Sequence, residues 1–88
     1  MLFMVVEHFK DAKAVYRRLL DKGRMLPEGL KYIRSWVEPN YNRCFQLMEC
    51  DDATLFQKWM INWQDLVDFQ VVPVVESKDA EKMIKPFL

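Results

Sequence analysis

The sequence predicts a single α+β domain in which a four-stranded antiparallel sheet carries two helices on one face. Short runs rich in strand formers alternate with segments whose apolar residues recur at helical spacing. The chain has 88 residues, 51% hydrophobic, with 13 basic and 13 acidic side chains. This composition suits one filled core over residues 1–88 and excludes a disordered chain. A proline in the last predicted strand places that strand at a sheet edge.

Residues 2–9 form the first predicted strand, because they are rich in strand formers and too few for a helix between turn signals. Asp11 is expected to cap the helix that follows, and Gly23 to end it. Residues 26–29, Leu-Pro-Glu-Gly, suit a type I turn. The apolar side of the helix consists of Ala12, Val15, Tyr16, Leu19 and Leu20.

A hairpin is predicted from residues 31–38 and 43–50, which flank the turn-forming residues 39–42. A turn centred there fixes which side chains lie opposite each other in the two strands. The expected pairs are Trp36 with Phe45, Arg34 with Leu47, Ser35 with Gln46, and Ile33 with Met48.

The remaining elements are a second helix, a fourth strand and a short terminal helix. Asp51 or Asp52 is expected to cap the second helix. Residues 67–75 form the fourth strand, which contains Pro73. Ser77 is expected to cap the last helix, and Pro86 to stop it. The apolar stripe of the second helix is Leu55, Phe56, Trp59, Met60, Trp63 and Leu66.

The element order is therefore β-α-β-β-α-β with an additional helix. Short right-handed crossovers turn this order into a ferredoxin-like sandwich with strand order 4-1-3-2 and both long helices on one face. This order makes the fourth strand an edge strand, as Pro73 independently requires.

The first and fourth strands carry apolar residues on both faces, whereas a sheet with one wet face should alternate apolar and polar residues. One face of four such strands measures about 400 Å². The terminal helix could shade at most about 150 Å² of it. We therefore expect self-association through the open face, with coverage by the chain's own last helix as the alternative.

We expect a cytoplasmic protein. No signal peptide is recognisable, and no apolar run approaches the ~20 residues that cross a bilayer. Cys44 and Cys50 are the only cysteines, and both fall in the predicted strand of residues 43–50. Their Cα atoms would lie too far apart for a disulfide, which indicates reduced thiols.

Several stretches together resemble a small bacterial family of unknown function. They are MLFMVVEHF, GRMLPEGL, SWVEPN, RCFQLMECDD, WMINWQDLVDF and VVPVV, and they cover nearly the whole chain. The family is similar in layout to the dimeric α/β-barrel superfamily, in which two ferredoxin-like protomers pack sheet to sheet. The resemblance implies a homodimeric barrel but no activity, because superfamily relatives include monooxygenases, lactone isomerases, haem-degrading enzymes and non-catalytic proteins.

The hairpin supplies most candidate ligand-binding residues. Ser35 and Gln46 could hydrogen-bond each other across the strands, or orient a ligand. Arg34, Trp36 and Glu49 could form a polar-aromatic pocket, with a solvated arginine as the alternative. The set that faces away from the helices would line the space between two sheets.

His8 completes the candidates as the only histidine, with acid–base use weighed against a role at the strand end. No metal set exists, and two glycines cannot build a phosphate loop, so we expect no metal and no cofactor. Zero net charge argues against nucleic acid. The basic residues Lys10, Lys13, Arg17 and Arg24 are interpreted as a solvated face.

Three hypotheses follow for function, and the catalytic residues remain unknown. The first is a homodimer that binds a small hydrophobic ligand between the two sheets. The second is a cofactor-independent enzyme, monooxygenase- or isomerase-like, acting on a small aromatic or lactone substrate. The third is a purely structural or regulatory interaction module. A sizeable cavity with converging polar groups would favour the first two.

Overall fold

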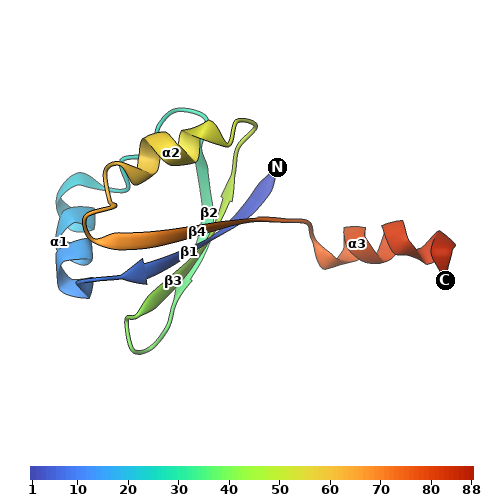
Figure 1. Cartoon of the computed structure of the whole chain (residues 1–88), viewed down its shortest axis with the longest axis horizontal. Coiled ribbons are helices and arrows are strands. Elements are labelled where there is room, and N and C mark those ends of the chain that lie inside the picture. The colour runs from blue at the N-terminus through green and yellow to red at the C-terminus, as the bar shows by residue number, and fades with distance from the viewer.

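The computed structural model describes all 88 residues and has the predicted α+β, ferredoxin-like layout (Figure 1). Two helices lie over one face of an open four-stranded sheet, and a third helix extends away from the body. The elements are β1 (Leu2–Phe9), α1 (Ala12–Lys22), β2 (Lys31–Val37), β3 (Arg43–Glu49), α2 (Thr54–Met60), β4 (Val67–Val74), α3 (Ser77–Ile84) and a 3₁₀ turn η1 (Lys85–Phe87).

The strand order is β2-β3-β1-β4, with every neighbouring pair antiparallel. This is the predicted order 4-1-3-2 read from the other edge. Pro73 lies in the edge strand β4, opposite Phe3 of β1. Proline has no N–H to donate to a neighbouring strand, and on the outer side of an edge strand no neighbouring strand is present. The prediction that the strand containing Pro73 lies at a sheet edge is therefore confirmed.

The two faces of the sheet have different surroundings. Phe3, Val5 and Glu7 of β1 are buried beneath the helices, whereas Leu2 and the other alternate residues point to the open face. The core is a cluster of ten buried residues from the sheet, both helices and their loops. They are Phe3, Val5, Val15, Leu30, Met48, Cys50, Phe56, Trp59, Trp63 and Val67.

The ends of α1 are as predicted. Asp11 accepts a hydrogen bond from the backbone N–H of Ala14 at 3.1 Å, and Gly23 ends the helix with a φ of 68°. The following turn is displaced by one residue, because the N–H of Leu30 donates to the carbonyl of Pro27. Gly29 thus occupies the third position at φ 93°, which is typical of a type II turn instead of the predicted type I.

The predicted extent of the second helix needs correction. The second helix ends at Met60, and residues 61–66 form successive turns, so Trp63 and Leu66 of the predicted stripe lie outside the helix. Consecutive turns place residues at nearly the same spacing as a helix does. The apolar periodicity of the sequence therefore continues through residues 61–66 although the helix does not. The N-cap residue of this helix is Ala53, which makes no side-chain capping bond, instead of the predicted Asp51 or Asp52. The Oδ1 atom of Asp52, one residue earlier, accepts from the N–H of Thr54.

The hairpin register agrees with the prediction except at its start. Trp36, Arg34 and Ser35 have the expected partners, but a bulge at Ile33 places Tyr32 opposite Met48. One extra residue in β2 shifts the alternation of side chains, so Tyr32 lies on the helix-covered face. The predicted pairing of Ile33 with Met48 is therefore wrong.

The last helix begins after Glu76, an extended residue whose carbonyl accepts from the N–H groups of Asp79 and Ala80. Ser77 is the first helical residue and makes no capping bond, contrary to the prediction. Pro86 lies in η1, just beyond the end of α3. No helix has the length and apolar character needed to span a membrane.

Candidate functional site

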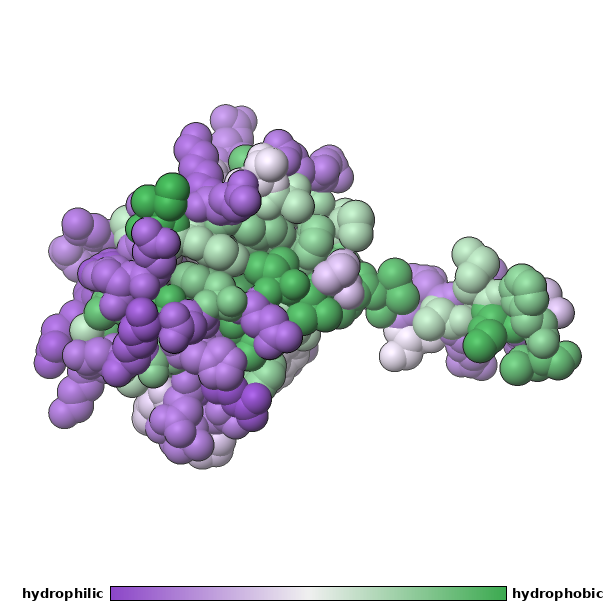
Figure 2. Space-filling view, viewed as in Figure 1, coloured by the Kyte–Doolittle hydropathy of each residue, from purple (hydrophilic) through white to green (hydrophobic).

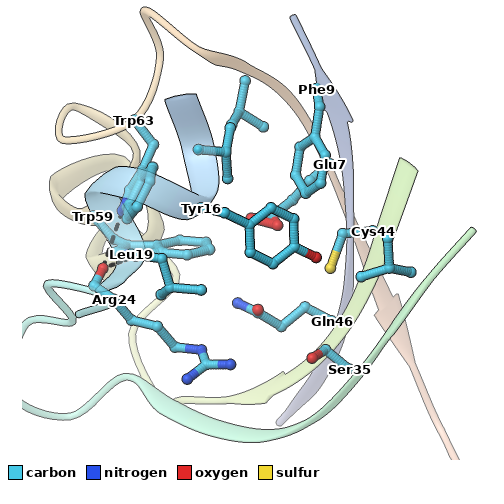
Figure 3. Close-up of a pocket in the computed structure, with 13 residues that line it drawn as sticks. Glu7, Phe9, Tyr16, Leu19, Arg24, Ser35, Cys44, Gln46, Trp59 and Trp63 are labelled. Atoms are coloured by element: carbon cyan, nitrogen blue, oxygen red, sulfur yellow. Dashed lines mark hydrogen bonds between the residues drawn. The ribbon is translucent and has the colours of Figure 1, made fainter. Parts of the chain in front are cut away.

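A cavity of about 130 Å³ lies between the helix-covered face of the sheet, α1 and the segment that contains α2 (Figure 3). Nine of its 13 lining residues are hydrophobic. The aromatic walls come from Phe9, Tyr16, Trp59 and Trp63. The polar groups at the cavity belong to Glu7, Tyr16, Arg24, Ser35, Cys44 and Gln46.

Glu7 is the buried charged residue of this cavity, with 9% of its surface exposed. Alternation along β1 directs it to the same side as Phe3 and Val5, and its carboxyl group points into the cavity (Figure 3). None of the four ion pairs of the chain involves Glu7. Burial raises the pKa of Glu7 from 4.5 to about 7, while a hydrogen bond from Cys44 and the charge of Arg24 oppose that rise.

Cys44 lies opposite Glu7 in the β1–β3 ladder. Burial, the negative charge of Glu7 and the hydrogen bond to its carboxyl group raise the pKa of the Cys44 thiol to about 12. A thiol with so high a pKa is protonated at neutral pH, which favours a hydrogen-bond donor over an activated nucleophile. Cys44 and Cys50 are both buried and free, so the prediction that they do not bridge is confirmed.

Arg24 fixes one end of the cavity through its backbone and its side chain. Its carbonyl oxygen accepts from the indole N–H of Trp59 at 2.9 Å and from that of Trp63 at 3.0 Å. Its guanidinium carbon lies 3.7 Å from the centre of the Tyr32 ring. Arg24 is half-buried in the loop after α1, so its assignment to a solvated face of that helix is wrong.

Only two of the six predicted site residues lie at this cavity. Ser35 and Gln46 face the helices, as neighbours in the β2–β3 ladder. Their side chains do not bond each other as expected. The hydroxyl of Ser35 pairs with the hydroxyl of Tyr32 at 2.8 Å, and the amide of Gln46 donates to the sulfur of Met48 at 3.2 Å.

The other four predicted residues, His8, Arg34, Trp36 and Glu49, do not line the cavity. By alternation they belong to the open face of the sheet. The guanidinium carbon of Arg34 lies 5.4 Å from the centre of the Trp36 ring, and 45% of Trp36 is exposed. His8 is exposed and lies between Arg43 of β3 and Asp68 of β4.

Glu7, the central polar group of the cavity, is not among the residues that the sequence pointed to. A usable signal was present. Glu7 takes the place of an apolar residue in the alternation Phe3, Val5, Glu7, Phe9. A carboxyl at a core position of a strand requires a buried partner or a function.

These features define a ferredoxin-like α+β domain with an aromatic cavity that contains one carboxyl group. No cluster of three or more His, Cys, Asp or Glu side chains is placed to hold a metal ion. The family model for a domain of unknown function (DUF3303) matches residues 1–88, so the chain belongs to this family. The resemblance found in the sequence is thereby confirmed at the level of a family of unknown function. Comparison with curated proteins and with solved structures found no match.

Proposed function

We propose that this protein is a homodimer in which each protomer binds one small, largely apolar molecule beneath its helices. The observation that carries the proposal is the carboxyl group of Glu7, which points into an aromatic cavity without a cationic partner in an ion pair. Burying such a group costs free energy, and sites that tolerate this cost are commonly functional.

The dimensions of the cavity limit the ligand. An apolar cavity of about 150 Å³ in an unrelated engineered protein takes up benzene, and the cavity here measures about 130 Å³. Drug-sized ligands need roughly 300 Å³ or more. The ligand class that fits is therefore a single ring or an aliphatic molecule of similar size.

The polar groups define one end of that ligand. Glu7 offers a carboxyl group and Gln46 an amide, while Trp59 and Trp63 form an apolar wall on the helix side. An ionised carboxylate accepts hydrogen bonds only, so the ligand should carry an O–H or N–H donor. Phenol has this size and this donor, and benzene is the matched molecule that lacks it.

This location differs from the one that the sequence suggested, the space between the two sheets. That space would use Arg34, Trp36 and Glu49, which belong to the open face. A cavity beneath the helices needs no second copy for its walls. The two locations can be separated, because Glu7 and Glu49 lie on opposite faces of the sheet.

The test is a titration of the protein with phenol and with benzene, followed by the amide and indole N–H resonances. Phenol should shift the amides of Glu7, Cys44 and Gln46 and the indole signals of the cavity. Glu7→Gln should weaken phenol binding about tenfold, because a hydrogen bond to a charged group is lost. Benzene binding should be unaffected by Glu7→Gln, and Glu49→Gln should bind both probes like the wild type.

Two results would contradict the proposed site. Shifts confined to open-face residues, together with weakened binding in Glu49→Gln, would place the ligand between the sheets. No shift with either probe at millimolar concentration would favour the third hypothesis, an interaction module with a filled interior.

The homodimer is supported by the open face, which no part of α1 or α2 covers (Figure 1). Leu2, Met4 and Val6 lie there on β1, beside Phe45 and Leu47 of β3. Soluble monomers rarely expose contiguous apolar patches of this size. Size exclusion with light scattering at micromolar concentration should give about twice the mass of one chain, and the mass of a single chain would remove this part of the proposal.

A second candidate function, an isomerase-like enzyme, is favoured by the pKa of Glu7, which is about 7. A carboxyl group with such a pKa can both take and return a proton near neutral pH. The test is to incubate the protein with an unsaturated five-membered lactone in heavy water and to measure the incorporation of deuterium into the lactone. Glu7 would remove a proton beside the carbonyl group and return a deuteron. If deuterium enters the lactone no faster than in buffer alone, or equally fast with the Glu7→Gln variant, the isomerase-like activity is contradicted and ligand binding remains the proposed function.

A further inference from the structure

The C-terminal arm, residues 75–88, leaves the end of β4 and points away from the rest of the molecule (Figure 1). Every residue of the arm is exposed, with Met83 at 75% and Phe87 at 84%. The radius of gyration is 15.0 Å, whereas a compact chain of this length would have about 12 Å. The arm therefore contributes little to the core of its own chain.

The arm is amphipathic. Ala80, Met83, Ile84 and Phe87 follow helical spacing along one side, and lysines occupy the opposite side. Figure 2 shows hydrophobic residues gathered towards the free end of the arm. α3 has eight residues, and isolated helices shorter than about 12 residues are marginal in water. Its apolar side therefore requires a surface to pack against.

The chain's own open face is not well placed to provide that surface. The segment between β4 and α3 continues outwards from the sheet (Figure 1). Glu76, in this segment, is extended, with φ −65° and ψ 143°. The carbonyl of Glu76 also accepts the first bonds of α3, which fixes the direction in which the helix starts. A return to the same sheet would need a reversal at these residues, and the chain has no glycine beyond Gly29.

The open face is the apolar surface that remains uncovered. Leu2, Met4, Val6, Phe45, Leu47 and Val72 belong to it. One face of four strands measures about 400 Å², whereas a stable interface buries about 800 Å² on each partner. An arm adds about 150 Å² to what each copy offers. The area of the sheet face alone is thus well below the area that a stable dimer buries on each partner. The arm increases the area that each copy can bury.

We propose that a second copy of this chain covers both surfaces by exchange of arms. The side of α3 that carries Met83 and Ile84 packs against the open sheet face of the other copy, beside the contact between the two sheets. This inference rests on the homodimer proposed above. A two-fold contact uses the arm and the face of both copies and leaves neither exposed. A different partner would have to match both surfaces separately.

The test compares two double variants of the full chain. Met83→Gln with Ile84→Gln changes the apolar side, and Lys78→Gln with Lys82→Gln changes the polar side of the same helix. Glutamine is a good helix former, and none of the four side chains is buried within its own chain. By sedimentation equilibrium, the first double variant should dissociate at least about tenfold more readily than the wild type. The second should dissociate like the wild type within about twofold.

The contact itself can be observed in dimers mixed from labelled and unlabelled copies. Isotope-filtered spectra should show contacts from the methyl groups of Met83 and Ile84 in one copy to those of Met4, Leu47 or Val72 in the other. Methyl contacts within one chain only would overturn the exchange, because the arm would then cover its own sheet. A wild-type dimer that the first double variant does not weaken would also overturn it while leaving the homodimer intact. A monomeric wild type would remove the homodimer as well.

Discussion

The carboxyl group of Glu7 and the thiol of Cys44 lie opposite each other on β1 and β3, and both line the cavity beneath the helices. Burial favours the neutral form of both groups. Glu7 is left able to exchange its proton near neutral pH, whereas Cys44 keeps its proton. The mainly apolar cavity therefore contains one carboxyl group that can gain or lose a proton near neutral pH, and the proposed ligand binding depends on this group.

Stability should depend on pH through Glu7. Folding raises its pKa from 4.5 to about 7, so the native state binds more protons than the unfolded state between these values. The free energy of unfolding should therefore fall as the pH rises through this window and level off above it. The full decrease is on the order of 3 kcal/mol.

Glu7→Gln cannot ionise and should lack this decrease. The variant should unfold much like the wild type below the window and be the more stable protein above it. Urea denaturation at fixed protein concentration and several pH values measures the difference. Glu49→Gln, on the opposite face, is the matched control and should keep the wild-type slope. Parallel pH profiles for wild type and Glu7→Gln would show that Glu7 titrates normally.

Cys44 should resist alkylation in the folded protein. Its thiol is buried and has a pKa of about 12, so little thiolate is present or accessible at neutral pH. Iodoacetamide labelling followed by mass spectrometry should modify the native protein at least about a hundredfold more slowly than the urea-unfolded protein. Rapid, stoichiometric labelling of native Cys44 would contradict the geometry described here.

Trp59 and Trp63 should be coupled through Arg24. Their indole N–H groups donate to the same carbonyl oxygen, at 2.9 and 3.0 Å. Trp59→Phe and Trp63→Phe should each lower the free energy of unfolding by about 1–3 kcal/mol through lost volume and one lost hydrogen bond.

The double variant should lose more than the sum of the two single effects. Only the double variant leaves the Arg24 carbonyl without either indole donor, which adds the cost of an unsatisfied acceptor. A double-mutant cycle from four urea denaturation curves measures this coupling. Strict additivity would mean that the two bonds act independently.

The sequence was sufficient for the topology. Pro73 identified the edge strand, and Asp11 and Gly23 bounded the first helix, because a missing N–H, a capping carboxylate and a positive φ are local requirements that a single residue meets. The order of elements then left few right-handed arrangements.

The sequence was insufficient where tertiary contacts decide. Nothing local indicates the bulge at Ile33, which moves Tyr32 beneath the helices and beside Arg24. The cavity depends on Glu7 and Arg24, which are 17 positions apart in the sequence and meet only in the fold. Three predicted site residues of the hairpin, Arg34, Trp36 and Glu49, lie elsewhere because pairing within the hairpin does not show which of its faces the helices cover.

The most direct test of the proposed site is a carbon-detected titration of the Glu7 side-chain carboxyl in the free protein and in the presence of saturating phenol or benzene. The free protein should give a pKa near 7. Phenol, which donates a hydrogen bond to the ionised form, should bring the pKa below that in the benzene complex, and phenol should bind more tightly as the pH rises. A Glu7 pKa near 4.5 that neither molecule changes would contradict the account.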